Sequence, residues 1–393
     1  MDWTIELLKG AGRFFLHPLV YYIVLYSLFL GTLRVKRERA AFHTKVEDIY
    51  DDLKFTFTKG LFIGLMVSAV IILTGLSLPF GLLIAAGIAA AGLSLFFKVQ
   101  LLSAAFTMGI AFAAAVILPS FPTDAILRFF EGIEETNLSA LTILTGILLL
   151  AEGLLVYRSG HIRTSPAIMV SSRGLPIGRH IANRTWMLPV IFFVPGGALT
   201  SVFSWWPVFE MNGQSFSLII APFLIGFRQS VRGSLPKESI QVSAKRIIWL
   251  GLLTLVIACA SVWWQPLAFV SILCAVAGRS FLIIRQKMND DSASFFFSKK
   301  DRGLMILGIL PGSPADKIGL KVGETIIKVN GTPVKNTGEF YEALQKNRAL
   351  CKLEMIGLNG EIRYEQRATY EGDHHELGLL FVEQPRIKSL DAV

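Results

Sequence analysis

The sequence predicts two parts: an α-helical polytopic membrane domain of about eight to nine transmembrane helices, followed by a smaller α+β domain. Of the 393 residues, 53% are hydrophobic and only 17% are charged, and the mean hydropathy is +0.55, whereas soluble domains are about a quarter charged. Long apolar runs fill the first 285 residues, and the remainder has an ordinary soluble composition. We therefore expect a membrane domain over 1–285 and a separate domain over 286–393.

The transmembrane helices are predicted from apolar runs, because crossing a bilayer takes about 20 residues of helix. A turn at Pro79 divides the long run 60–97, and "WWQP" divides the run 246–284 in the same way. The candidate spans are 13–33, 60–78, 79–97, 101–119, 139–157, 186–206, 214–228, 246–265 and 266–284. The count falls to eight if the first run, broken by "HPL" at 17–19, is re-entrant or if one neighbouring pair is miscounted.

Lys and Arg gather in alternate connections and after the last span, whereas the other connections contain few of them. The basic segments are 34–59, 158–184, 228–246 and 285–287. Basic connections lie on the cytoplasmic side of a membrane, so we expect the C-terminal domain in the cytoplasm. The same pattern explains the formal net charge of +9, and no nucleic-acid partner is expected.

The connection 40–59 carries apolar residues at helical spacing with acidic and basic residues between them. This pattern predicts an amphipathic helix that lies along the membrane or against other loops. A helix that binds a partner protein is the alternative.

Few features of the membrane domain indicate transport, which usually needs ionisable residues in mid-membrane and broken helices. Glu152 is the candidate charge, and we expect it to reach the interface or to pair with an arginine. The "VPGG" sequence at 194–197 is interpreted as a tolerated helix kink.

The C-terminal part is predicted from its turn residues. Ser313 can cap a short helix, Pro314 fits its first turn and Gly319 can end it. Gly323 and the pair Asn330-Gly331 supply two further turns. The expected elements are strands at 303–310 and 325–331, helices at 314–318 and 336–346, and a hairpin at 349–366.

This order of elements, with the segment "PGSPADKIGLKVGETIIKVNG" at 311–331, resembles a bacterial PDZ domain. The matching structural residues are Gly312, Pro314, Gly319, Gly323, Asn330 and Gly331. One departure is Glu324, where the family usually has Asp. The resemblance implies a module that adds an extended peptide to a sheet edge, beside its second helix.

Two segments compete for the peptide-binding strand. The first is 294–298, which contains Phe295, Phe296 and Phe297, and the second is 376–382, in which Gly378 belongs to a resembling carboxylate loop. On the second helix, Phe340 and Leu344 are the groove candidates. Each of these apolar residues has burial in the core as its alternative role.

No catalytic or metal-binding set is evident. The sequence lacks the spacing of a serine protease nucleophile, the His-Glu-x-x-His of a metalloprotease, and paired cysteines of a zinc site. We therefore expect neither enzyme activity nor a cofactor nor a metal.

The segments "WTIELLKGAGRFFLHPLVYY" and "RVKRERAAFHTKVED" resemble the start of the MinJ family, PDZ-containing membrane proteins of rod-shaped Gram-positive bacteria. The resemblance implies an adaptor in division-site selection that links the polar scaffold DivIVA to MinD, and that is enriched at septa and poles. Membrane lipid is the other expected partner, and self-association stays open. A PDZ-regulated transporter or a membrane-protease-associated protein is the alternative.

Overall fold

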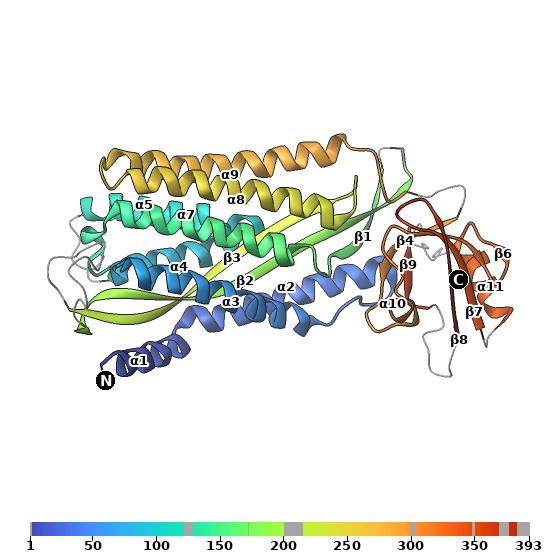
Figure 1. Ribbon diagram of the computed structural model, residues 1–393, viewed down its shortest axis with the longest axis horizontal. Helices are drawn as coiled ribbons and strands as arrows, with labels where there is room; N and C mark the ends of the chain where they lie inside the picture. The colour runs from blue at the N-terminus through green and yellow to red at the C-terminus, as the bar shows by residue number, and fades with distance from the viewer. Residues whose placement is uncertain are drawn as a thin grey trace, which may run out of the picture.

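The computed structural model describes residues 2–121, 129–171, 173–199, 215–298, 303–347, 350–368 and 377–382. The helices form an elongated bundle around a long β-hairpin, and the C-terminal domain lies at one end of that bundle (Figure 1).

Within the described residues, five helices are long and apolar enough to cross a membrane. They are α2 (Pro18–Phe42), α3 (Ile49–Thr74), α7 (Leu138–Leu155), α8 (Pro236–Ala260) and α9 (Pro266–Ser292). Among the described residues of the bundle, the shorter α-helices are α1 (Asp2–Leu16), α4 (Phe80–Ser94) and α5 (Ala104–Ile117). The expected count of eight to nine spans is therefore not confirmed, although α4 and α5 lie where two of the spans were expected.

The prediction of helices at 186–206 and 214–228 is wrong for the residues described, because these runs contribute to strands. β1 (Ser165–Val170), β2 (Pro176–Leu199) and β3 (Phe216–Val231) form an antiparallel sheet in the order β1-β2-β3. Pro189 faces Pro222 across the two long strands. The predicted helix kink at 194–197 is likewise part of β2, where the register shifts between Pro195 and Leu199.

The physical reason for this error is burial on both faces of the hairpin. The strand β3 is buried or half-buried along almost its whole length, so it lacks the apolar–polar alternation of a half-exposed strand. A continuous apolar run does not distinguish a buried strand from a buried helix. The β-branched and aromatic stretch "VIFFV" at 190–194 was the local signal for a strand.

The segment 40–59 does not form one amphipathic helix. α2 ends at Phe42, the chain turns through His43 with a φ of 58°, and α3 begins at Ile49 after a capping box made by Asp48 and Asp51. The helical periodicity therefore belongs to the start of α3, which continues without a break into the apolar residues of the bundle.

The centre of the bundle contains a buried ion pair. Arg279 of α9 donates from Nε to Oε1 of Glu152 on α7 at 3.0 Å, and both side chains are almost fully buried. The other carboxylate oxygen accepts from the Ser103 hydroxyl at 2.6 Å and from the Ala104 amide at 3.0 Å. The expectation that Glu152 pairs with an arginine is confirmed.

The C-terminal domain contains β4 (Leu304–Ile309), α10 (Pro314–Ile318), β5 (Thr325–Val329), β6 (Thr332–Pro333), α11 (Thr337–Gln345), β7 (Leu350–Ile356), β8 (Ile362–Ala368) and β9 (Leu379–Phe381). Its main strands are ordered β8-β7-β5-β4-β9. This order and the two helices match the predicted elements, with β9 at one edge of the sheet.

The turn residues act as the sequence predicts. The Ser313 hydroxyl accepts from the Asp316 amide at 3.3 Å at the start of α10, and Gly319 ends that helix with a φ of 79°. Gly323 has a φ of 94°, and the Asn330-Gly331 pair has φ values of 49° and 80°. These left-handed residues are the sites at which glycine or asparagine is most easily accommodated.

Candidate functional site

The candidate peptide site lies between the edge strand β9 and the helix α11. Among the described strands, β9 pairs only with β4, so its other edge is not occupied by a strand. The rings of Phe340 on α11 and Phe381 on β9 lie 5.1 Å apart between centroids and make an edge contact. A sheet edge beside a helix is the geometry that PDZ domains use for an added peptide strand.

The turn before β9 is held against the body of the domain. Leu377 and Gly378 have φ values of 54° and 76°. The carbonyl of Leu377 accepts from the Ala315 amide at 3.0 Å, and that of Gly378 accepts from the Leu310 amide at 2.8 Å. A Cβ at position 378 would collide with the side chain of Ser313, so the close approach of the two loops requires glycine there.

The structure places three of the candidate site residues around β9: Gly378 in the turn before it, and Phe340 and Leu344 in the apolar cluster that contains Leu379 and Phe381. Gly378 precedes β9, Phe340 is fully buried, and Leu344 is a half-buried residue that packs on the same apolar cluster. Phe340 is thus a core residue beneath the groove, whereas Leu344 stays partly accessible. Peptide binding by these residues is a proposal that rests on this placement.

The alternative strand at 294–298 is not part of the PDZ sheet. Phe297 is fully buried and its carbonyl accepts from the Gly178 amide of β2 at 2.8 Å. Phe296 donates its amide to the Arg232 carbonyl at 2.9 Å, and Phe295 lies under the Arg232 guanidinium. These three phenylalanines join the C-terminal domain to the membrane domain, so their position does not support a role in the groove.

Sequence reasoning missed this junction between the two domains. His180 of β2 donates from Nε2 to the carbonyl of Leu307 on β4 at 2.8 Å, while its Nδ1 accepts from the Thr164 hydroxyl at 2.9 Å. The His180 ring also lies 5.0 Å from that of Phe297. Burial lowers the pKa of His180 to about 4. The aromatic run at 295–297 was the available signal in the sequence. A short apolar run does not, however, indicate which part of the protein it packs against.

A network of charges fixes the turn between α2 and α3 beside this junction. Asp52 accepts from Arg34 at 2.8 Å and from Arg184 of β2 at 3.1 Å. Glu47 pairs with Arg163 at 3.3 Å. A cavity of about 550 Å³ separates this turn from the loop at 310–314 of the C-terminal domain.

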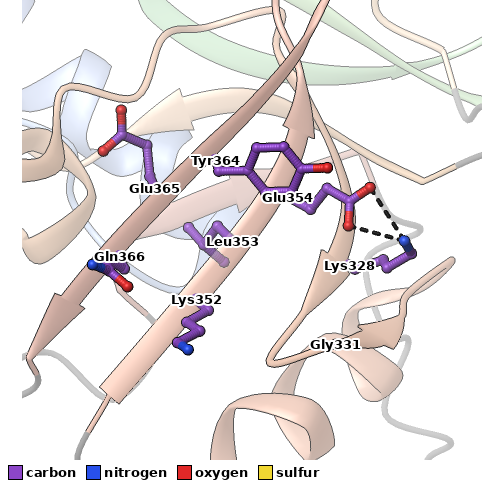
Figure 2. Close-up of a pocket in the computed structure, with 8 residues that line it drawn as sticks. All are labelled: Lys328, Gly331, Lys352, Leu353, Glu354, Tyr364, Glu365 and Gln366. Atoms are coloured by element: carbon purple, nitrogen blue, oxygen red, sulfur yellow. Dashed lines mark hydrogen bonds and ion pairs between the residues drawn. The ribbon is translucent and has the colours of Figure 1, made fainter.

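A second hollow, of about 490 Å³, lies over the strands β5, β7 and β8 of the PDZ sheet (Figure 2). It is lined by Lys328, Gly331, Lys352, Leu353, Glu354, Tyr364, Glu365 and Gln366. Lys328 and Glu354 form an ion pair across it at 2.9 Å. Its lining includes no histidine, serine or cysteine.

Searched over the described ranges, the chain brings no three His, Cys, Asp or Glu side chains together in a way that could hold a metal ion.

Comparison with known proteins gives a consistent picture. A PDZ domain family model matches residues 305–355. The chain is 50% identical to the cell division topological determinant MinJ of Bacillus subtilis, over 98% of this chain and 97% of that protein. It is 25% identical to a probable cell division topological determinant MinJ of Lacticaseibacillus paracasei, over 92% of this chain and 95% of the relative.

A third similarity is confined to a short segment. A probable periplasmic serine endoprotease of the DegP type from Marinomonas is 37% identical over 58 residues, which is 15% of this chain and 12% of that protein. This likeness covers only the PDZ region and does not extend to a protease domain.

Proposed function

The chain belongs to the MinJ family of cell division topological determinants, and on that premise we propose that it is a membrane adaptor in division-site selection. In this proposal the membrane domain localises the protein. The PDZ domain and the neighbouring loops link a DivIVA-type polar scaffold to a MinD-type inhibitor. The adaptor acts by binding and not by catalysis.

The proposed topology is multi-pass, with the PDZ domain in the cytoplasm and the protein enriched at septa and poles. Support comes from the placement of basic residues. The C-terminal part of α2 and the start of β2 lie towards the end of the bundle that carries the PDZ domain (Figure 1). These parts of the sequence contain Arg34, Arg37 and Arg184, and the carbonyl of Arg232 after β3 accepts from the Phe296 amide of the junction. Basic residues concentrate on the cytoplasmic side of membrane proteins.

The observation that carries the proposed binding role is the combination of β9 and α11. The strand β9 leaves one edge without a strand partner among the described residues, and the turn at Leu377 and Gly378 precedes it. A peptide from a division partner would pair with β9 through main-chain hydrogen bonds, while its side chains contact α11 near Leu344.

A pull-down tests the proposal by comparing how much of a division partner is recovered with the full-length protein and with its Gly378→Val variant. Its side chain would collide with Ser313 and displace the turn before β9, so recovery of one division partner should fall at least about tenfold, or about 1.4 kcal/mol. The matched control is Gly360→Val, in the β7–β8 turn, where φ is also positive and no atom lies within 4 Å of the added Cβ.

Membrane insertion should be normal in both variants. A chain ending at Ser298, which keeps the junction segment, should lose the same partner. Undiminished recovery by both Gly378→Val and the shortened chain would contradict recruitment through the PDZ groove and leave the α2–α3 turn as the candidate.

A further inference from the structure

Three arginines gather on one face of the β1-β2-β3 sheet, next to the end of α2. Arg37 lies in the last turns of α2, Arg179 in β2 and Arg228 in β3. Arg37 and Arg179 each lie close enough to Arg228 to be repelled by its positive charge, and Arg179 also repels Arg37. Asn183 faces Arg228 directly in the strand register, and alternation along β2 places Arg179 and Asn183 on the same face.

This face is open at the cluster, although the sheet is buried elsewhere. Arg228 is the exposed residue of β3, whose other residues are buried or half-buried. Arg179, Asn183 and Ser230 around it are half-buried. A ligand can therefore reach the guanidinium groups from outside.

The cluster has unsatisfied polar atoms. Nε of Arg37, Nε of Arg179 and Oδ1 of Asn183 are buried without a hydrogen-bond partner in the part of the chain that the structure describes. Arg37 uses Nη2 to donate to the Ser165 hydroxyl at 2.9 Å, which is neutral. Leaving a buried donor unpaired is unfavourable, and more so for a charged group.

The neighbouring carboxylates, those of Glu38 and Asp290, bind other partners. Glu38 accepts from the Ser165 hydroxyl at 2.7 Å and from the Val46 amide at 2.9 Å, and it pairs with Arg34. Asp290 accepts from the Arg232 amide at 2.9 Å and pairs with its guanidinium. Arg37, Arg179 and Arg228 repel one another electrostatically. Within the described residues, none of the three forms a salt bridge with a carboxylate.

An exposed apolar stripe leads to the same cluster. Phe29, Leu33 and Arg37 are spaced four residues apart, so they share one face of α2. The centroid of the Phe29 ring lies 5.4 Å from that of the Phe97 ring. The side chains of Phe29, Leu33 and Phe97 are each more than 40% exposed.

Phe97, on the other side of this stripe, lies just before the short helix η1 (Val99–Leu102), which packs closely on β3. A Cβ at Gly226 would meet the Val99 carbonyl, and Gly226 is two residues from Arg228 on the same face of the strand. Leu33 and Arg37 are neighbours on one face of α2, so the stripe leads directly to the arginines.

We propose that the arginine cluster of Arg37, Arg179 and Arg228 binds the phosphate of an anionic phospholipid, with an acyl chain lying along Phe29, Leu33 and Phe97. A phosphodiester supplies several acceptor oxygens, which suits the planar fork of arginine. Free phosphate would satisfy the cations but would leave the apolar stripe unused, so the position of the stripe next to the arginines favours a lipid.

Native mass spectrometry of the full-length protein in a neutral detergent tests this site. The probes are phosphatidylglycerol, phosphatidylcholine with the same acyl chains, and inorganic phosphate. Phosphatidylglycerol should be retained preferentially. Each guanidinium near an anionic lipid contributes about a fivefold change in binding, so Arg179→Gln with Arg228→Gln should reduce retention about 25-fold.

The matched control removes the same charge from exposed positions nearby, with Arg39→Gln and Arg173→Gln, and should change retention less than about twofold. If the double variant unfolds, Arg228→Gln alone carries the test, because its side chain is exposed. Equal loss in the control pair, equal retention of the two lipids, or displacement by inorganic phosphate at the lipid's own concentration would overturn the proposal.

Discussion

The backbone at Gly319 shows how one residue shapes the PDZ domain. Gly319 ends α10 with a φ of 79°, and no atom would lie within 4 Å of an added Cβ. A substitution here therefore introduces conformational strain and not a collision. The left-handed region costs an ordinary residue about 1–2 kcal/mol, and a β-branched residue more.

Gly319→Val should lower the free energy of unfolding of the PDZ domain by at least about 2 kcal/mol. Proteolysis of the full-length protein checks this, since cleavage within 303–368 should accelerate while the membrane domain stays intact. The control is Gly338→Ala in α11, where φ is not positive and the change should stay within about 0.5 kcal/mol. Equal protease resistance of Gly319→Val and the unaltered chain would contradict the strain argument.

At the scale of elements, local signals determined which predictions succeeded. The turns of the C-terminal domain were predictable because Ser313, Gly319 and Asn330 act on backbone atoms a few residues away. The strands β2 and β3 were not, because their apolar runs lack alternation when both faces are covered. Of the candidate site, the sequence offered the segments 294–298 and 376–382 as two options, and in the structure β9 pairs with β4 whereas Phe297 bonds to Gly178 of β2.

The ion pair between α7 and α9 supports a prediction at this scale. Glu152→Gln leaves the buried Arg279 guanidinium without its counter-charge, and breaking one side of a buried pair costs about 3–5 kcal/mol. Thermal unfolding in detergent should detect this loss.

The double variant Glu152→Leu with Arg279→Met serves as the control for this pair. It should recover much of the stability, because apolar replacements of a buried pair are often tolerated. Loss of stability in the double variant equal to the sum of both single variants would show that the two side chains do not act as a pair.

Over the whole molecule, the PDZ domain is fixed to the bundle by a surface that contains a titratable group. Burial keeps His180 neutral near pH 7, and in this neutral form Nε2 donates to the Leu307 carbonyl while Nδ1 can accept from the Thr164 hydroxyl. Phe297 packs against the His180 ring, so a charged imidazolium would be buried in an apolar contact. The orientation of the C-terminal domain relative to the helix bundle therefore depends on a junction in which protonation of His180 is unfavourable.

The pH dependence of this junction follows from the lowered pKa. Burial lowers the pKa of His180 to about 4, against about 6.5 in an unfolded chain. Between these values the unfolded state binds more protons, so this stability contribution is complete above pH 6.5 and is lost as the pH falls towards 4. From pH 7 to pH 5 the loss should be about 2 kcal/mol.

Unfolding of the full-length protein at these two pH values measures the effect. His180→Gln should be less stable at pH 7 and should lack this part of the pH dependence. His43→Asn is the control, because His43 is exposed and asparagine tolerates its positive φ, so this variant should keep the full dependence. If His180→Gln loses as much stability between pH 7 and pH 5 as the unaltered chain does, another group carries the effect, and the junction is held independently of the protonation of His180.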